Sequence, residues 1–316
     1  MAKTYDIAQL VEQAREGKPR AVARLITLVE DASPQLREVM TALMPFTGNA
    51  HIVGVTGSPG VGKSTSTSAL VGQFRQAGKR VGILAVDPSS PFSGGALLGD
   101  RIRMQEHSSD PGVYIRSMAS RGHLGGLSWS TPQALRVLDA AGCDVILLET
   151  VGVGQSEIEV VGVADTVLVL LAPGMGDGIQ AAKAGILEIG DIFVVNKADR
   201  DGASNTSREL RHMVGLTPRT EGAWTPPVLK TVASRGEGIE KVAEAIEKHY
   251  VWAQSSGALH ERRRKRAASE IEAIALTALR TRMGGFGEGK LNTLAGQVAA
   301  GKQDPYAAAD ELIANV

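Results

Sequence analysis

The chain has 316 residues, of which 43% are hydrophobic, so it is long and apolar enough to bury one large core with small additions at its ends. Basic and acidic residues number 34 each, which leaves no overall field to attract nucleic acid or an anionic membrane. We therefore expect no nucleic-acid partner. Cys143 is the single cysteine, so we expect no disulfide framework and a cytoplasmic location. No window approaches the ~18 uncharged apolar residues of a membrane span, so we also expect no membrane partner.

Residues 1–49 are predicted to form a small helical extension. Apolar residues recur at helical spacing in two stretches separated by Gly17. The stretches carry Ile7, Leu10, Val11 and Ala14, and then Ala21, Leu25, Leu28 and Val29. Ser33-Pro34 is typical of an N-cap followed by the first residue of a third helix.

Residues 50–252 are predicted to form an α/β domain, because short apolar runs alternate with helical patterns. The near-continuous Val, Ile and Leu content of these runs indicates a parallel sheet covered by helices on both faces. The seven candidate strands are Ile52 to Thr56, Val81 to Val86, Val113 to Ser117, Val145 to Glu149, Thr166 to Ala172, Ile192 to Asn196 and Val228 to Val232. Ligands of such sheets bind beyond the carboxyl ends of the strands.

The first candidate strand is followed by a phosphate-binding loop. Its sequence is Gly57-Ser58-Pro59-Gly60-Val61-Gly62-Lys63-Ser64, which matches G-x-x-x-x-G-K-[ST] between a strand and a helix. The glycines let backbone N–H groups turn toward phosphate, Lys63 reaches the outer phosphates and Ser64 offers a hydroxyl to Mg²⁺. We predict nucleotide contacts from this loop and from Thr65, which follows it.

Acidic residues end two further candidate strands. Glu149 stands where an Mg²⁺-linked carboxylate belongs, although a solvated strand end would have the same sequence. Asp87 has the same placement, with capping of the following turn as its alternative. Gly152 is a candidate for a backbone contact to the γ-phosphate. Val153 occupies the position where Ras-like enzymes carry a water-orienting glutamine, which predicts slow hydrolysis without a partner.

Asn196-Lys197-Ala198-Asp199 follows the sixth candidate strand and predicts the choice of base. The Asp199 carboxylate can accept from both N1–H and the exocyclic amine of guanine, whereas adenine offers an acceptor at the first of these places. Together with the phosphate-binding loop, Asn196, Lys197 and Asp199 predict GTP and GDP as ligands and disfavour ATP.

Residues 253–316 are predicted to form a helical arm. Ala267, Ile271, Ile274 and Ala278 make a narrow apolar stripe that suits a partner helix, so we expect a homodimer, with folding back onto the same chain as the alternative. The basic run from Arg262 to Arg266 is interpreted as a solvated helix surface rather than an RNA contact. Asp304-Pro305 is expected to begin a last helix.

The assembled motifs resemble the methylmalonyl-CoA mutase-associated GTPases, the MeaB/ArgK family that includes the human MMAA protein. The resemblance runs over nearly the whole chain and is carried by long stretches beyond the phosphate-binding loop. These are Ala85 to Gly95, Leu98 to Arg101, Ser120 to Leu127 and Glu149 to Ser156.

The resemblance implies a dimeric P-loop GTPase with an N-terminal helical extension and a C-terminal dimerisation arm. It also implies a chaperone that uses GTP to gate adenosylcobalamin loading into methylmalonyl-CoA mutase and to protect or reactivate this enzyme. The resemblance implies four catalytic residues, namely Lys63, Asp87, Asp100 and Glu149. The three carboxylates together with Ser64 would hold Mg²⁺, and Asp100 is included because of the resemblance alone. The loop Val232-Ala233-Ser234 would contact the base.

Two other functions stay open. Some proteins of this kind carry an older name as kinases of an amino-acid-transport binding protein, but a kinase needs a substrate hydroxyl and a base beside it. A GTPase that inserts metal into another enzyme would fit the same core, but the sequence lacks the Cys/His clusters that such proteins use.

Overall fold

The computed structural model describes residues 4–87, 105–119, 130–150, 160, 162–174, 187–282 and 288–313. The chain forms two compact units, Met1–Leu259 and His260–Val316. The finer division predicted from the sequence, with boundaries after residues 49 and 252, stays a prediction.

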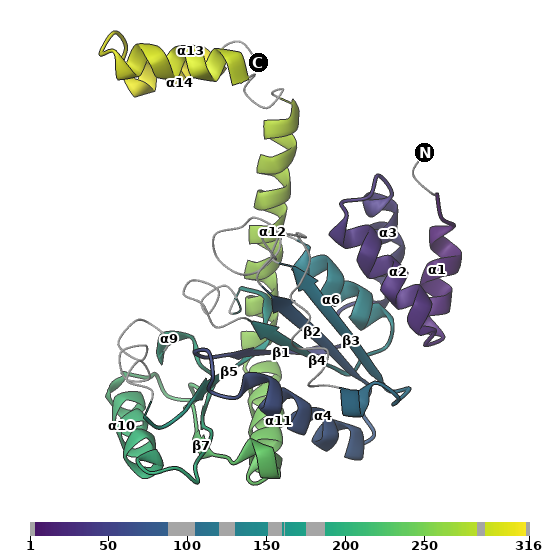
Figure 1. The fold of residues 1–316 in the computed structure, drawn as a ribbon, viewed down its shortest axis with the longest axis vertical. Helices are drawn as coiled ribbons and strands as arrows, with labels where there is room; N and C mark the ends of the chain where they lie inside the picture. Colours follow the sequence, from purple (N-terminus) through teal and green to yellow (C-terminus); the bar gives the residue numbers. More distant parts are fainter. Residues whose placement is uncertain are drawn as a thin grey trace. The chain divides into compact units, whose positions relative to one another are not determined.

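Seven strands among the described residues form one sheet in the order β3-β2-β4-β1-β5-β6-β7, and every neighbouring pair is parallel (Figure 1). The strands are β1 (His51–Thr56), β2 (Val81–Asp87), β3 (Val113–Ala119), β4 (Val145–Thr150), β5 (Thr166–Leu171), β6 (Ile192–Val195) and β7 (Val228–Lys230). All residues of the central strands β1, β4 and β5 are buried, as expected for a parallel sheet covered on both faces. The predicted fold class, an α/β P-loop domain with helical additions at both ends, is confirmed.

The last strand is two residues shorter than the sequence predicts. Beyond Lys230, the Thr231 N–H still donates to the Val195 carbonyl, but Val232 instead pairs with Glu237 in an isolated antiparallel bridge. The chain therefore leaves the sheet at Lys230 and turns back toward the carboxyl end of β6.

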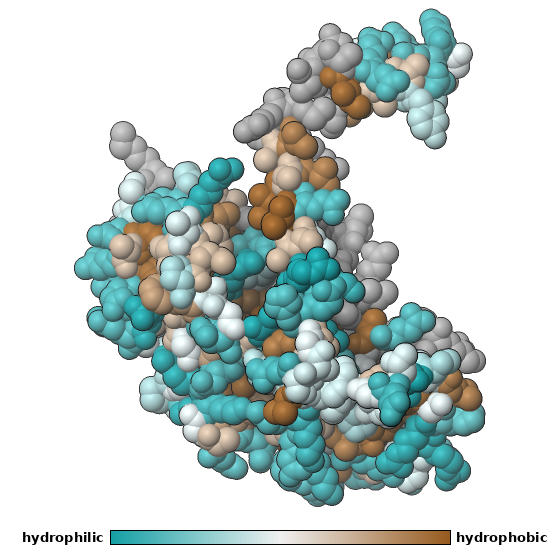
Figure 2. Space-filling model, turned by 180° about the vertical axis from the view of Figure 1, so that it is seen from behind, coloured by the Kyte–Doolittle hydropathy of each residue, from teal (hydrophilic) through white to brown (hydrophobic). Residues whose placement is uncertain are grey.

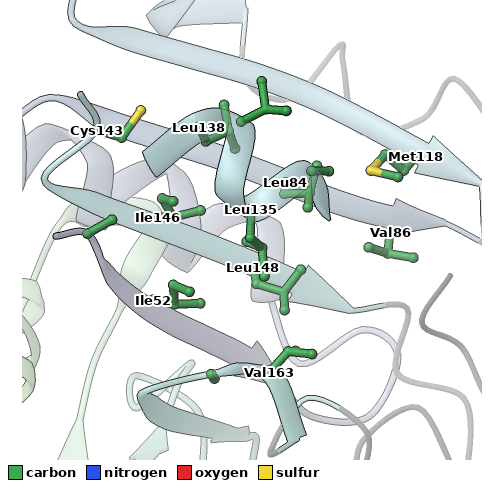
Figure 3. Packing of buried hydrophobic residues seen from close by; sticks show 14 of the residues in the cluster. Ile52, Leu84, Val86, Met118, Leu135, Leu138, Cys143, Ile146, Leu148 and Val163 are labelled. Carbon is green, nitrogen blue, oxygen red and sulfur yellow. The ribbon is translucent and has the colours of Figure 1, made fainter. Parts of the chain in front are cut away.

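Helices cover the two faces of the sheet in two separate apolar cores. Those of the sheet domain are α4 (Lys63–Gln76), α6 (Thr131–Ala140), α9 (Leu187–Ile189), α10 (Ala203–Leu216) and α11 (Ile239–Ser255), with short 3-10 turns η1 (Met44–Phe46), η2 (Gln105–His107) and η4 (Ala233–Arg235). On one face α4 and α11 contribute to one core, whereas α6 and α10 contribute to the other. In Figure 3, Leu135 and Leu138 of α6 lie over Ile146 and Leu148 of β4.

Three N-terminal helices share the core of α6. They are α1 (Ile7–Arg15), α2 (Pro19–Glu30) and α3 (Leu36–Leu43), and Figure 1 shows them gathered beside α6. The Asp6 side chain caps α1 by accepting from Gln9 N at 3.0 Å. The predicted cap at Ser33-Pro34 is wrong: α3 begins at Leu36, because the Ser33 carbonyl accepts from Leu36 N and forms a turn before the helix.

Asp139 of α6 fastens the segment that joins this helical extension to β1. Its carboxylate accepts from three successive backbone N–H groups, those of Gly48 at 2.5 Å, Asn49 at 3.2 Å and Ala50 at 2.9 Å. Gly48 has a φ of +99°, which favours glycine there. The linker is thus tied to the same helix that supports β4.

The C-terminal segment is helical, as predicted. Its helices are α12 (Ala258–Arg282), α13 (Glu288–Ala299) and α14 (Pro305–Ile313), of which α13 and α14 contact each other and bury Leu294 and Ala308. Asp304 caps α14 by accepting from Tyr306 N and Ala307 N, which confirms the predicted start of this helix. No helix in the described part of the chain has the length and apolar character of a membrane span.

Candidate functional site

The phosphate-binding loop follows β1 at the carboxyl edge of the sheet. Gly57, Gly60 and Gly62 have φ values of +142°, +81° and +97°, in the region that glycine adopts without strain. A Cβ on Gly57 would lie 2.3 Å from the Leu170 carbonyl oxygen, and one on Gly62 would lie 2.4 Å from Asn196 Nδ2. The loop therefore needs glycine at both places for conformation and for space. Gly62 precedes the first residue of α4, so the loop leads into a helix N-terminus, which favours anions.

Lys63 is directed into this loop. Its ammonium donates to the Gly57 carbonyl at 2.6 Å and lies 3.3 Å from the Ser58 carbonyl. Phosphate oxygens are strong acceptors for the same donors, so a phosphate in the loop would meet a positive charge that is already positioned.

Ser64 and Glu149 meet at the adjoining strand end. The Ser64 hydroxyl donates to Glu149 Oε1 at 2.6 Å, and both residues are buried. The register of β1 with β4 pairs Val55 with Glu149, so this carboxylate lies one residue from the carboxyl end of β1. A hydroxyl and a carboxylate are hard oxygen donors of the kind that Mg²⁺ selects, so the pair fits this ion.

The remaining predicted metal ligands are less well placed. Asp87 ends β2 at the same edge of the sheet, one residue beyond the pairing of Val86 with Thr150, and its side chain is not described. Asp100 and Gly152 lie outside the described residues. Within the described ranges, no group of three or more His, Cys, Asp or Glu side chains is arranged to hold a metal ion.

Asn196 connects its own segment to the phosphate-binding loop and to the predicted base loop. Its Oδ1 accepts from the Thr231 hydroxyl and from Ala233 N, both at 3.1 Å, and its Nδ2 donates to the Val61 carbonyl at 2.8 Å. The side chain is buried, so all three contacts are shielded from water. Asn196 therefore fixes the predicted base loop relative to the phosphate-binding loop.

Lys197 makes a second link, since its ammonium donates to the Gly60 carbonyl at 2.6 Å. Its φ of +55° is uncommon for a residue with a side chain and turns the chain sharply after β6. The Asp199 side chain, two residues on, is 38% exposed. In the base loop Val232 and Ala233 are buried and Ser234 is exposed, as is Thr65 on α4.

The phosphate-binding loop and the Asn196 segment lie together, as the sequence predicts, and the structure adds two residues beside them. Thr231 donates to Asn196, and Arg235 approaches Asp199 with its Nη2 atom 3.6 Å from Oδ2. Both flank the predicted base loop, and that proximity was the available signal. Direct nucleotide contacts by the predicted residues stay a prediction.

Comparison with known proteins places this site in a family. A family model described as "Methylmalonyl Co-A mutase-associated GTPase MeaB" matches residues 22–285. The chain belongs to this family. As a MeaB-family member it is a P-loop GTPase, and the predicted family is confirmed.

Individual relatives agree with the family match. A Pyrococcus abyssi protein with GTPase in its name is 48% identical over 313 residues, covering 98% of this chain and 97% of that one. The "Methylmalonic aciduria type A homolog, mitochondrial" of Caenorhabditis elegans is 36% identical over 282 residues, covering 82% and 70% of the two chains. A solved structure of a protein named "LAO/AO transport system kinase" matches this MeaB-family fold with a TM-score of 0.74 and 26% identity, over 99% of this chain and 98% of that one.

Proposed function

We propose that this MeaB-family GTPase gates adenosylcobalamin loading into methylmalonyl-CoA mutase and protects or reactivates the mutase. The observation that carries the proposal is the family match over residues 22–285, whose description names the mutase. In this role the GTPase binds the mutase and does not itself hold cobalamin. Nucleotide state sets which complex with the mutase is stable, because a ligand shifts a conformational equilibrium only by its different affinity for the two states.

The site residues have separate tasks in this proposal. Ser64 and Glu149, with Asp87 and Asp100, hold Mg²⁺, which when bound offsets negative charge on the phosphates. The Lys63 ammonium binds the outer phosphates, and the N–H groups at the start of α4 orient them. Asp199 accepts from N1–H and the exocyclic amine of guanine, so adenine is bound less well. Hydrolysis is slow until a partner completes the site.

A homodimer through the C-terminal arm belongs to the same proposal. Ile271, Ile274, Leu276 and Leu279 of α12 are each more than half exposed. Figure 2 shows hydrophobic atoms in brown along this helix. Of these residues, Ile271 and Ile274 lie on the same side of α12 and belong to the predicted apolar stripe, and such a stripe suits a matching helix of a second copy. Sedimentation at micromolar concentration tests this, and a monomer there would contradict it. A cytoplasmic location is likewise proposed, because the one cysteine, buried Cys143, suits a reducing compartment.

The test is phosphate release by the purified protein with GTP or ATP, in the presence and absence of purified apo-mutase. We expect the protein to hydrolyse GTP but not ATP, and to hydrolyse GTP faster when the mutase is added. Transfer of adenosylcobalamin to the apo-mutase, followed by its absorption spectrum, should require GTP and be lost with Lys63→Ala. GTP hydrolysis that does not respond to the mutase would contradict the mutase role and leave the nucleotide chemistry in place.

A second candidate is a protein kinase, favoured by the name "LAO/AO transport system kinase" of the solved protein that shares this fold. The two functions differ in the acceptor of the γ-phosphate, which is water for the GTPase and a protein hydroxyl for the kinase. Labelled γ-phosphate that appears on a transport binding protein rather than as free phosphate would favour the kinase.

A further inference from the structure

Arg235 lies between two carboxylates, those of Asp199 and Glu237, just after the predicted base loop. Its Nη2 is 3.6 Å from Asp199 Oδ2, and its Nη1 is 3.8 Å from Glu237 Oε1. Charge-assisted hydrogen bonds are shorter, about 2.7–2.9 Å, so the guanidinium is attracted to both groups and bonded to neither. The Arg235 side chain is 61% exposed, and water therefore weakens both attractions.

The backbone around Arg235 is fixed even though its side chain is not. Arg235 N donates to the Val232 carbonyl at 2.9 Å, and Val232 and Glu237 exchange backbone hydrogen bonds of 3.0 and 3.3 Å. Gly236, with a φ of +72°, makes the turn between Arg235 and Glu237. Asn196 holds this loop and also begins the segment that carries Asp199. The Arg235 guanidinium can therefore move from Asp199 toward Glu237 by a side-chain rotation, without a change in the backbone.

The position of Arg235 conflicts with base recognition. Guanine needs both oxygens of Asp199, one for N1–H and one for the exocyclic amine. A guanidinium is also a planar donor that uses carboxylate oxygens in pairs. Guanine and Arg235 therefore present the same kind of donor edge to the same acceptor.

We propose that Arg235 competes with guanine for Asp199 and moves to Glu237 when guanine binds, so that Arg235 and Glu237 together set the affinity for GDP and its rate of release. This inference rests on the proposed role of Asp199 as the guanine acceptor. Glu237 matters because it offers the displaced cation a second carboxylate at nearly the same distance. Without Glu237 the cation stays with Asp199, and guanine binds at a greater cost.

The experiment measures release of fluorescently labelled GDP, and its competition by GDP and ADP, for the full chain and four variants. The variants are Arg235→Gln, Glu237→Gln, the double variant and Arg37→Gln. Arg37 is an exposed arginine of α3, so its variant removes the same charge far along the chain from the site. We expect Arg235→Gln to tighten GDP binding and slow its release by about two- to five-fold, the scale of an exposed ion pair.

Glu237→Gln should weaken GDP binding by a similar factor, and the double variant should behave like Arg235→Gln. These differences should shrink in about 0.5 M NaCl, since salt screens exposed charges. Affinity for ADP should stay unchanged, because adenine makes no comparable use of Asp199.

Three results would overturn the competition. Arg235→Gln that weakens GDP binding would mean that Arg235 contacts the nucleotide. Arg235→Gln that matches Arg37→Gln would mean that it has no effect on the base. Glu237→Gln that still weakens GDP binding in the absence of Arg235 would mean that Glu237 acts by another route. The proposed role of Asp199 fails separately, if the unsubstituted protein binds ADP as tightly as GDP.

Discussion

Polar side chains have opposite roles at the two ends of the sheet strands. At the carboxyl ends, Lys63, Lys197 and Arg235 are held by loop carbonyls or by long ion pairs at partly open positions. At the amino ends, four polar side chains form a buried chain of contacts, here termed the amino-end network. Its members are His51, Thr166, Asp191 and His249.

The amino-end network crosses the sheet from strand to strand. The Thr166 hydroxyl lies 2.7 Å from His51 Nε2 and 2.7 Å from His249 Nδ1. A hydroxyl has one proton, so Thr166 accepts from at least one of the two rings and can donate to at most one of them. His249 Nε2 lies 3.3 Å from Asp191 Oδ1 without the geometry of a hydrogen bond. Asp191 in turn accepts from Val167 N at 2.8 Å.

Aromatic rings line this network. Tyr250 stacks on His51 with ring centroids 4.0 Å apart, and Trp224 meets His249 edge-on at 5.0 Å. Thr166 has no exposed surface. The group of Thr, His and Asp resembles a nucleophilic triad in composition, but a substrate could not reach its hydroxyl. Polar groups at the amino ends of the strands therefore stabilise the fold, whereas polar groups at the carboxyl ends can exchange their present contacts for contacts with a ligand.

The largest expected effect that separates the two ends is that of Lys63→Ala. We expect it to lower GTP hydrolysis by about 10²–10³-fold, the scale of removing one charge-stabilising donor, with little change in the urea midpoint. Lys241→Ala, at an exposed position of α11, is the matched control. Turnover by Lys63→Ala within tenfold of the unsubstituted protein would remove Lys63 from catalysis.

The opposite result is expected for His249→Ala. Its loss leaves Thr166 and Asp191 buried with a partner missing, so the free energy of unfolding should fall by about 2–4 kcal/mol. GTP hydrolysis per folded molecule should stay within about twofold of the unsubstituted protein, because the contacts of this ring in the described part of the chain are to Thr166, Asp191 and two tryptophans at the amino end of the sheet.

Urea unfolding and phosphate release on the same samples test this second prediction, with the exposed His212→Ala of α10 as control. A stability loss no larger than the control's would mean that the amino-end network contributes nothing to folding. A loss of turnover without a loss of stability would mean that the two ends are coupled.

Asn196→Ala sharpens the comparison, because Asn196 is buried like the amino-end network but lies at the carboxyl end. Removing its three contacts should lower the free energy of unfolding by about 1–3 kcal/mol. GDP affinity should also fall, by about tenfold or more, since the base loop loses its link to the phosphate-binding loop. Urea unfolding and GDP titration measure the two effects, and a change in only one of them would contradict the shared role.

The sequence predicted the carboxyl end far better than the amino end. The phosphate-binding loop and the Asn196 segment are local motifs whose spacing reports their chemistry, and the strands before them are continuous apolar runs. His51 of β1 and His249 of α11 are far apart in the sequence, and the fold brings both of them to Thr166 of β5. Such a network has no local pattern, since each member lies on a different element. The start of α3 was missed for a related reason, as a turn and a first helical residue share the same Ser-Pro signal.

The smallest effect concerns Cys143, which precedes β4 at the amino end. Burial raises the pKa of this thiol to about 12 from its usual 9.0. The folded state therefore keeps a proton that the unfolded state loses first, so stability is intact below the unfolded pKa and falls as pH rises from there toward the folded value. Between about pH 8 and about pH 10 this group should remove about 1 kcal/mol. Cys143→Ala should lack that part of the decline, as measured by urea midpoints. An equal decline in both proteins would mean that burial at this end does not couple the thiol to folding.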